Sequence, residues 1–183
     1  MLVTGCGPIG ALAIIAARRA GATHIVATDV GSHTLGKALK VGADEVVNVA
    51  EEPEGLARFT ADKGQFDVLF EASGNQRALV GAFEALRPRG IVVQLGLGGE
   101  MTLPINTIVA KEFDLRGAFR FHEEFAVAVE LLNKAGGREA ADLGHAVLPR
   151  FGARLRARRR PLAGHEGAAQ LRLRSKEARQ PFL

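Results

Sequence analysis

The six residues at positions 5–10, GCGPIG, restrict what this chain can fold into more than any other stretch. They make a complete G-x-G-x-x-G pattern between a short apolar run at residues 2–4 and an apolar run with helical spacing that starts at Ile9. Glycine and alanine are frequent in this chain, so the pattern alone is weak. A strand before such a turn and a helix after it are the arrangement that binds a dinucleotide. The sequence therefore predicts a strand-turn-helix unit at the start of the chain.

Each position of this turn has an expected task. Gly5 permits a tight turn, Gly7 lets the backbone approach a pyrophosphate, and Gly10 lets the helix pack closely on the strand. Pro8 and Ile9 open the helix, where a proline loses no hydrogen bond. The helix N-terminus offers free N–H groups and the positive end of a dipole to phosphates. We expect these five residues to contact a cofactor; a glycine turn without a ligand is the alternative.

The acidic residue that accompanies such a turn is Asp29, 19 positions after Gly10 and at the end of the expected second strand. Its carboxylate can accept hydrogen bonds from both hydroxyls of a ribose and would repel a 2′-phosphate. NAD is therefore favoured, with NADP left open. Val30 follows Asp29 and is expected to contact the same nucleotide. The alternative is a solvated carboxylate at a strand end.

The chain alternates strands with helices as far as residue 134. Strands are predicted at residues 2–4, 24–30, 45–49, 66–72, 91–99 and 113–119, and helices over residues 8–21, 32–42, 75–87 and 122–135. Residues 51–64 are polar with some helical character. Several strands are continuous apolar runs, which is typical of a parallel sheet buried on both faces. The predicted fold class is α/β, a doubly wound parallel sheet of the Rossmann type over residues 1–134.

Two stretches that contain glycine, EASG at residues 71–74 and QLGLGG at residues 94–99, end the fourth and fifth expected strands. In open α/β sheets, ligands bind beyond the carboxyl ends of the strands, and small residues there leave room for them. We expect Ser73, Gly74 and Gly96 to contact the cofactor. A simple turn is the alternative for either stretch.

Residues that could carry chemistry or bind a metal are scattered. Cys6 is the one cysteine, which excludes an internal disulfide and a multi-cysteine zinc site. His24, His33 and His122 show no metal-ligand spacing, and we see no Ser-His-Asp, Cys-His or Tyr-x-x-x-Lys combination. We assign no catalytic residue and no metal site. No apolar run reaches the ~20 residues of a membrane helix and no secretory leader is visible, so we expect a cytoplasmic protein without membrane contacts.

Six stretches of the chain resemble one protein family. LVTGCGPIGALA, ATDV, KVGADEVVN, FDVLFEASGN, GIVVQLGLGG and LRGAFRF are similar to the coenzyme domain of the zinc-type, medium-chain alcohol and polyol dehydrogenases, over residues 2–133. GAFRFHEEF is most similar to the L-idonate 5-dehydrogenases, which stand close to the sorbitol dehydrogenases. The resemblance implies reversible oxidation of a sugar acid or polyol by NAD or NADP, of the type that converts L-idonate to 5-ketogluconate. It also implies that the full-length members are homo-oligomers.

The same resemblance implies which residues lie near the nicotinamide: Leu95, Gly96, Leu97, Phe119 and Arg120. Sorbitol-type relatives often carry arginine where this chain has Thr34, which leaves the preference for NAD less defined. In the family, a preceding catalytic domain supplies the zinc ligands. We expect that catalytic domain to be absent here, so that this chain binds no zinc, is inactive alone, and is monomeric or aggregation-prone.

Residues 135–183 differ in character from the rest of the chain. They carry 11 Lys and Arg against 4 Asp and Glu, a net +7, whereas residues 1–134 carry 13 against 16, a net −3. Neither a strand period nor a helix period persists, so we expect a disordered tail without a packed core. A shift of one base in permissible codons turns residues 154–171 into AFELAGDRSRAMKVQLNF and residues 135–145 into RVDVRPLISAT, both similar to the end of the family. We therefore expect the tail to be frame-slipped.

Two alternatives to a frame-slipped tail stay open. One is a genuine disordered extension. The second makes the chain a non-catalytic nucleotide-binding module whose basic run, RARRR, binds the phosphate backbone of nucleic acid. Nucleic acid is the less favoured partner, because electrostatic attraction of this kind can be accidental.

Overall fold

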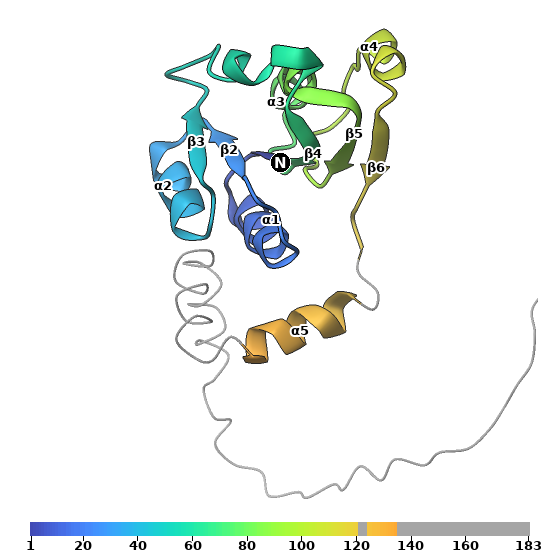
Figure 1. Cartoon of the computed structure of the whole chain (residues 1–183). Coiled ribbons are helices and arrows are strands. Elements are labelled where there is room, and N and C mark those ends of the chain that lie inside the picture. The colour runs from blue at the N-terminus through green and yellow to red at the C-terminus, as the bar shows by residue number, and fades with distance from the viewer. Residues whose placement is uncertain (121–123, 135–183) are drawn as a thin grey trace, which may run out of the picture.

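The computed structural model describes residues 1–120 and 124–134 of the chain. In these residues six strands form one sheet in the order β3-β2-β1-β4-β5-β6 (Figure 1). All neighbouring strands run parallel. The strands are β1 (Leu2–Thr4), β2 (Val26–Asp29), β3 (Glu45–Asn48), β4 (Phe66–Glu71), β5 (Leu86–Gln94) and β6 (Asp114–Gly117). The strand order reverses direction between β1 and β4, which confirms the predicted doubly wound sheet.

Helices cover the sheet from both sides. The α-helices are α1 (Pro8–Arg19), α2 (Ser32–Lys40), α3 (Gln76–Gly81), α4 (Ile105–Ala110) and α5 (Glu124–Lys134), and three short 3₁₀ helices are η1 (Ala57–Phe59), η2 (Ala61–Lys63) and η3 (Phe83–Ala85). The helices predicted after the glycine turn and after the second strand are confirmed. Gly21 has φ +94° just beyond α1, the left-handed conformation expected of a glycine at a helix C-terminus.

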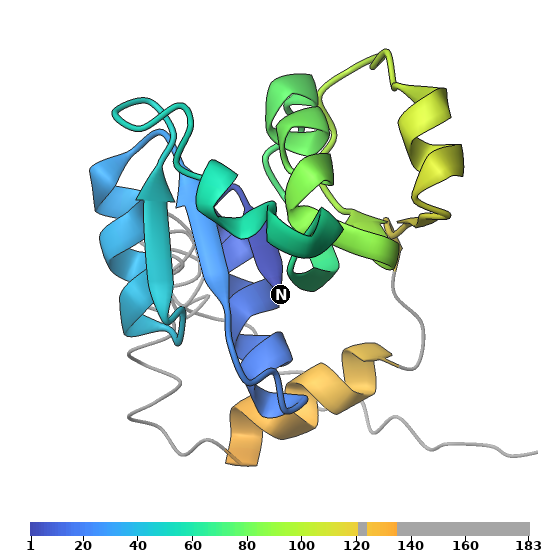
Figure 2. The same ribbon diagram turned by 45° about the horizontal axis from the view of Figure 1, so that its top comes forward.

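The core lies on the two faces of the sheet, because successive side chains of a strand point to opposite faces. Leu2 belongs to a buried cluster that includes Leu79 of α3. Its neighbour Val3 belongs to a second cluster that includes Ile14 of α1 and Leu35 of α2. Figure 2 shows the same layering, with α1 and α2 on one side of the strands and the η1–η2 segment on the other.

The helix predicted over residues 75–87 is wrong in its second half. Leu79, Phe83 and Leu86 are all buried and recur at helical spacing, which explains the prediction. In the structure α3 stops at Gly81 and β5 begins at Leu86. The pairing of β5 with β4 shifts register after Leu86, so that residues 87–90 bulge out of the ladder. A bulge tolerates Pro88, which has no N–H to donate.

Other segments also differ from the sequence predictions. The strand predicted at residues 91–99 ends at Gln94 and leaves residues 95–99 as a loop. Helix α4 is not predicted, because six residues are too few to show a period. The polar stretch 51–64 forms only the 3₁₀ turns η1 and η2.

Strand β6 and helix α5 lie toward the end of the described chain. All four residues of β6, an edge strand, are exposed. Helix α5 matches the last predicted helix where the structure describes it. The expectations about residues 135–183, a disordered and frame-slipped tail, lie outside the described residues. Among the helices of the described part, none is long and apolar enough to cross a membrane.

Candidate functional site

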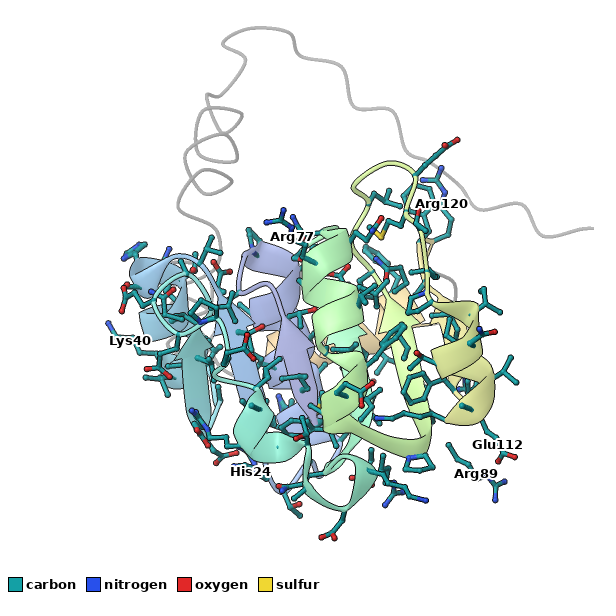
Figure 3. The ribbon with its side chains drawn as sticks, turned by 90° about the horizontal axis from the view of Figure 1, so that it is seen from above. His24, Lys40, Arg77, Arg89, Glu112 and Arg120 are labelled. Atoms are coloured by element: carbon teal, nitrogen blue, oxygen red, sulfur yellow. The ribbon has the colours of Figure 1, made fainter. Side chains whose placement is uncertain are left out.

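The predicted site residues gather at the end of the sheet where the parallel strands finish. The loops after β1, β2, β4, β5 and β6 all leave this edge, because parallel strands end on the same side. Figure 3 marks this end by Arg77 and Arg120, which follow β4 and β6. His24, Arg89 and Glu112 lie at the opposite end.

The turn between β1 and α1 is as tight as its glycines suggest. Gly5 has φ +87°, and a Cβ placed there would lie 2.6 Å from the backbone nitrogen of Ser73. A Cβ on Gly10 would overlap the carbonyl oxygen of Gly5. Both glycines are therefore required by contacts within the chain. At Gly7, by contrast, an added Cβ would meet no described atom within 4 Å, so packing does not explain the glycine there.

Helix α1 begins with unpaired backbone donors. Gly7 is the N-cap and Pro8 the first helical residue, and no side chain caps this helix end. The first intrahelical bond runs from the N–H of Ala11 to the carbonyl of Gly7, which leaves the N–H groups of Ile9 and Gly10 free of helical partners. The first turn holds no acidic residue. An anion is the ligand that such a helix end attracts.

Asp29 joins the loop after β2 to this turn. One carboxylate oxygen accepts a hydrogen bond of 2.6 Å from the N–H of Cys6, and the other accepts one of 2.9 Å from the N–H of Gly31. Each oxygen keeps a second lone pair for a further donor such as a ribose hydroxyl. Val30, beside it, is 68% exposed. Burial, and then the charge of Asp29, raise the pKa of the Cys6 thiol to about 12.

A polar cluster that sequence reasoning missed lies next to Asp29. The side-chain amide of Asn48 donates to the hydroxyl of Ser32 at 3.1 Å and to the carboxylate of Glu51 at 2.7 Å. The Ser32 hydroxyl donates to the same carboxylate at 3.3 Å. Asn48 ends β3, which pairs with β2, so the edge rule used for the other strands could have found it. The hydroxyl of Thr34 donates a hydrogen bond of 2.6 Å to the carbonyl of Gly31.

Glu71, the last residue of β4, is completely buried. Its carboxylate accepts hydrogen bonds from the N–H groups of Ser73 and Gly74 and from the Ser73 hydroxyl. It also accepts from the side chains of Thr4 and Gln94. In the sequence, Glu71 stands out only as the first residue of EASG. The available signal was an acidic residue directly after the apolar run VLF.

Hydrogen bonds and close packing join the loops after β4 and β5. The N–H groups of Leu95 and Gly96 both donate to the backbone carbonyl of Glu71, each at 2.8 Å. A Cβ on Gly98 would overlap the carbonyl oxygen of Gly74. Ser73, Gly74, Leu95 and Gly96 thus lie together at the carboxyl edge of the sheet, and their contacts with a cofactor remain a prediction. Leu97 projects outward and is 78% exposed.

Phe119 and Arg120 follow β6 at the same edge. The Phe119 side chain is 65% exposed, and the Arg120 guanidinium lies over its ring at 4.2 Å from the centroid. The N–H of Ala118 donates to the carbonyl of Gln94 at 3.0 Å, which ties this segment to the end of β5. The segment that carries both residues therefore leaves the sheet next to the end of β5.

Within residues 1–120 and 124–134, no three His, Cys, Asp or Glu side chains lie close enough together to hold a metal ion. Cys6, the one thiol, is buried and has a raised pKa. A zinc ion needs deprotonated thiolate, imidazole or carboxylate ligands in a shared site. The described residues do not offer such a site.

Comparison with known proteins gives a consistent set of relatives. Residues 8–134 match the family described as zinc-binding dehydrogenase. L-Idonate 5-dehydrogenase (NAD(P)(+)) of Escherichia coli strain K12 is 41% identical over 133 residues, which are 72% of this chain and 38% of that protein. Sorbitol dehydrogenase of Homo sapiens is 35% identical over 138 residues, with the same coverage of 72% and 38%. The chain thus spans 38% of the length of these curated relatives.

Solved structures show the same relationship. The crystal structure of L-idonate 5-dehydrogenase from Escherichia coli K-12 superposes with a TM-score of 0.67 at 41% identity, over 70% of this chain and 37% of that one. The structure of 2R,3R-butanediol dehydrogenase from Bacillus subtilis superposes with a TM-score of 0.68 at 30% identity, over 78% and 41%. The expected similarity to L-idonate and sorbitol dehydrogenases is confirmed.

Proposed function

The chain belongs to the zinc-binding dehydrogenase family, and from this membership we propose that it binds a nicotinamide dinucleotide at the carboxyl edge of its sheet. The observation that carries the proposal is the turn between β1 and α1. Gly5 and Gly10 are required by packing, whereas at Gly7 the chain leaves space above an uncapped helix N-terminus. A pyrophosphate needs both a close backbone approach and free N–H groups.

The other predicted residues extend this site in both directions. The pyrophosphate would lie over Gly7, Pro8 and Ile9. The adenosine ribose would take the remaining lone pairs of Asp29, with Val30 beside it. The nicotinamide half would lie along a second group of residues: Ser73, Gly74, Leu95, Gly96, Leu97, Phe119 and Arg120.

The proposed reaction of the whole enzyme is the reversible oxidation of a sugar acid or polyol, because the relatives named above act on L-idonate and sorbitol. The bound dinucleotide would supply the hydride acceptor. The residues of this chain would bind and orient it. Zinc would not be held by the described residues, so we propose that this chain alone binds the cofactor without turning over an alcohol.

Titration with NADH, followed by fluorescence or calorimetry, tests the proposal. Gly7 has φ −64°, which alanine adopts readily, and its Cβ would meet no described atom. Gly7→Ala should therefore fold normally but weaken NADH binding by about tenfold or more, since a methyl group would block the phosphates. Gly36→Ala is the matched control, because Gly36 lies within α2 and an added Cβ there also meets nothing.

The outcomes separate clearly. Saturable NADH binding by the wild type and by Gly36→Ala, with a loss in Gly7→Ala, supports the proposal. No saturable binding by the wild type, or equal binding by all three proteins, refutes it. In the same solutions, L-idonate and NAD with added zinc should produce no NADH.

A further inference from the structure

We propose that Glu71 is a positioning residue, which holds the loops after β4 and β5 in the arrangement that receives the nicotinamide half of the dinucleotide. This inference rests on the function proposed above and assigns a task to a carboxylate that would not itself touch the cofactor. It follows from the place of Glu71 in the sheet, from its partners, and from what the arrangement leaves unsatisfied.

Glu71 lies at the centre of the carboxyl edge. It pairs in register with Thr4 at the end of β1 and with Gln94 at the end of β5. The side chains of these three residues meet on one face of the sheet, since Thr4 donates to Glu71 at 3.4 Å and Gln94 at 2.6 Å. Glu71 therefore ties together the last residues of three adjacent strands, immediately below the loops that leave them.

The same carboxylate shapes the loop after β4. One oxygen accepts the N–H of Ser73 at 2.8 Å and also its hydroxyl. Both oxygens accept the N–H of Gly74, at 3.1 Å and 3.0 Å. Successive backbone N–H groups are thus turned inward onto one side chain, and the loop bends at Gly74, where φ is +67°.

Glycines let both neighbouring loops approach this bend closely. A Cβ on Gly96 would lie 2.7 Å from a carboxylate oxygen of Glu71, so the loop after β5 runs directly over the acid. A Cβ on Gly5 would lie 2.6 Å from the nitrogen of Ser73. The turn between β1 and α1 (residues 5–10), called the phosphate turn below, therefore rests against the other side of the same loop. A displacement of residues 73–74 would therefore alter the spacing between the phosphate turn and residues 95–97.

Stability alone does not explain this arrangement. The partners of Glu71 are neutral amides and hydroxyls, and no ion pair of the described residues includes it. A buried carboxyl group without a cationic partner is unfavourable relative to an apolar side chain of similar volume. The amide of Gln94 uses its two N–H groups on Glu71 and on the carbonyl of Gly96, and its oxygen is left buried without a partner. Such departures from good packing are concentrated at functional sites.

The test compares NADH with AMP, because AMP lacks the nicotinamide half. AMP would bind to the phosphate turn and to Asp29. The hydrogen bond from the N–H of Cys6 to Asp29, which joins these two, does not involve Glu71. In the full 183-residue chain, Glu71→Gln should weaken NADH binding by about tenfold, because an amide nitrogen cannot accept the bonds that an oxygen accepted. Its affinity for AMP should stay within about twofold of the wild type. Glu54→Gln, at an exposed position, is the control for loss of one charge.

A second variant decides the matter if Glu71→Gln fails to fold. Gln94→Met keeps the length of the side chain, removes the donor to Glu71 and removes the buried unpaired oxygen. It should lower the ratio of NADH to AMP affinity in the same direction. A purely structural role would reduce the melting temperature and leave this ratio unchanged. Equal losses for the two ligands, or no loss, in the folded variants overturn the inference. A wild-type chain that binds AMP but not NADH overturns the proposed function, and the inference with it.

Discussion

The carboxylate of Asp29 accepts a hydrogen bond of 2.6 Å from the backbone N–H of Cys6, so the acid that ends β2 is bonded directly to the glycine turn that follows β1. The residue expected to recognise the ribose therefore also helps to set the shape of the phosphate turn. A substitution of Asp29 can therefore change both the recognition of the ribose and the shape of the turn.

We expect Asp29→Ala to weaken NAD binding by about tenfold or more, because the ribose loses a charged acceptor. NADP binding should fall less, because the repulsion of its 2′-phosphate is removed at the same time. Parallel titrations with the two cofactors measure the difference. Equal losses for NAD and NADP would remove Asp29 from the recognition of the ribose and leave it only its hydrogen bonds from Cys6 and Gly31.

Glu51 is expected to act against NADP as a second negative charge. Its carboxylate is held near the start of α2 by Asn48 and Ser32. Glu51→Gln should raise the affinity for NADP by roughly two- to fivefold at low salt, since exposed like charges at short range repel by about 1 kcal/mol. The gain should shrink in high salt, and NAD binding should not change. Glu54→Gln, three positions along the same exposed segment, should leave both cofactors unaffected.

Lys111 is predicted to stabilise the end of the sheet opposite the site. Its Nζ donates to the carbonyls of Phe83, Leu86, Glu84 and Lys63 at 2.8–3.2 Å. Lys111→Met should lower the free energy of unfolding by about 2–3 kcal/mol, because these carbonyl oxygens would lose the hydrogen-bond donor of Lys111. Urea denaturation measures the change, and exposed Lys40→Met is the comparison. NADH affinity should be unaltered; a loss of cofactor binding would contradict the separation of the two ends.

The thiol of Cys6 should make the protein less stable in alkali. Burial raises its pKa to about 12 from an ordinary value of 9.0. Above pH 9 the unfolded chain releases this proton while the folded chain retains it, so stability falls between pH 9 and pH 12. Cys6→Ala should lack this part of the decline when unfolding free energies are compared over that range. Iodoacetamide should label Cys6 slowly in the native protein at pH 8 and rapidly in urea.

The basic tail can be tested without reference to its structure. Removing residues 135–183 should leave the NADH affinity within about twofold, because every proposed cofactor contact lies before residue 121. The coding DNA across codons 133–183, read one base later, should spell an ending similar to RSRAMKVQL. If it does not, the frame slip is wrong. Salt-sensitive binding of DNA by the full chain, lost on truncation, would then favour the nucleic-acid alternative.

The shape of the glycine turn can be predicted from the sequence because neighbouring residues set it, whereas the contacts of Asp29 with a ribose remain a prediction. Gly5, Gly10 and Asp29 belong to one strand-helix-strand unit, in which the length of α1 fixes where the acid must fall. The task of Glu71 depends on the pairing of β1, β4 and β5, which are distant in sequence. The hydrogen bonds of Glu71 therefore cannot be predicted from the residues next to it in the sequence. The start of β5 was missed for a different reason: buried side chains in a 3₁₀ turn and a bulge can imitate the spacing of a helix.

The pairing of β1 with β4 also determines when the proposed site can form. Thr4 and Glu71 are 67 residues apart in the chain but meet at the middle of the sheet. Contacts of such long range form slowly, because a large loop must close before any of them is gained. During synthesis, the glycine turn leaves the ribosome well before the strand against which it must rest. The turn and Asp29 can form early, but the carboxyl ends of β1 and β4 come together only after β4 has been made and has paired.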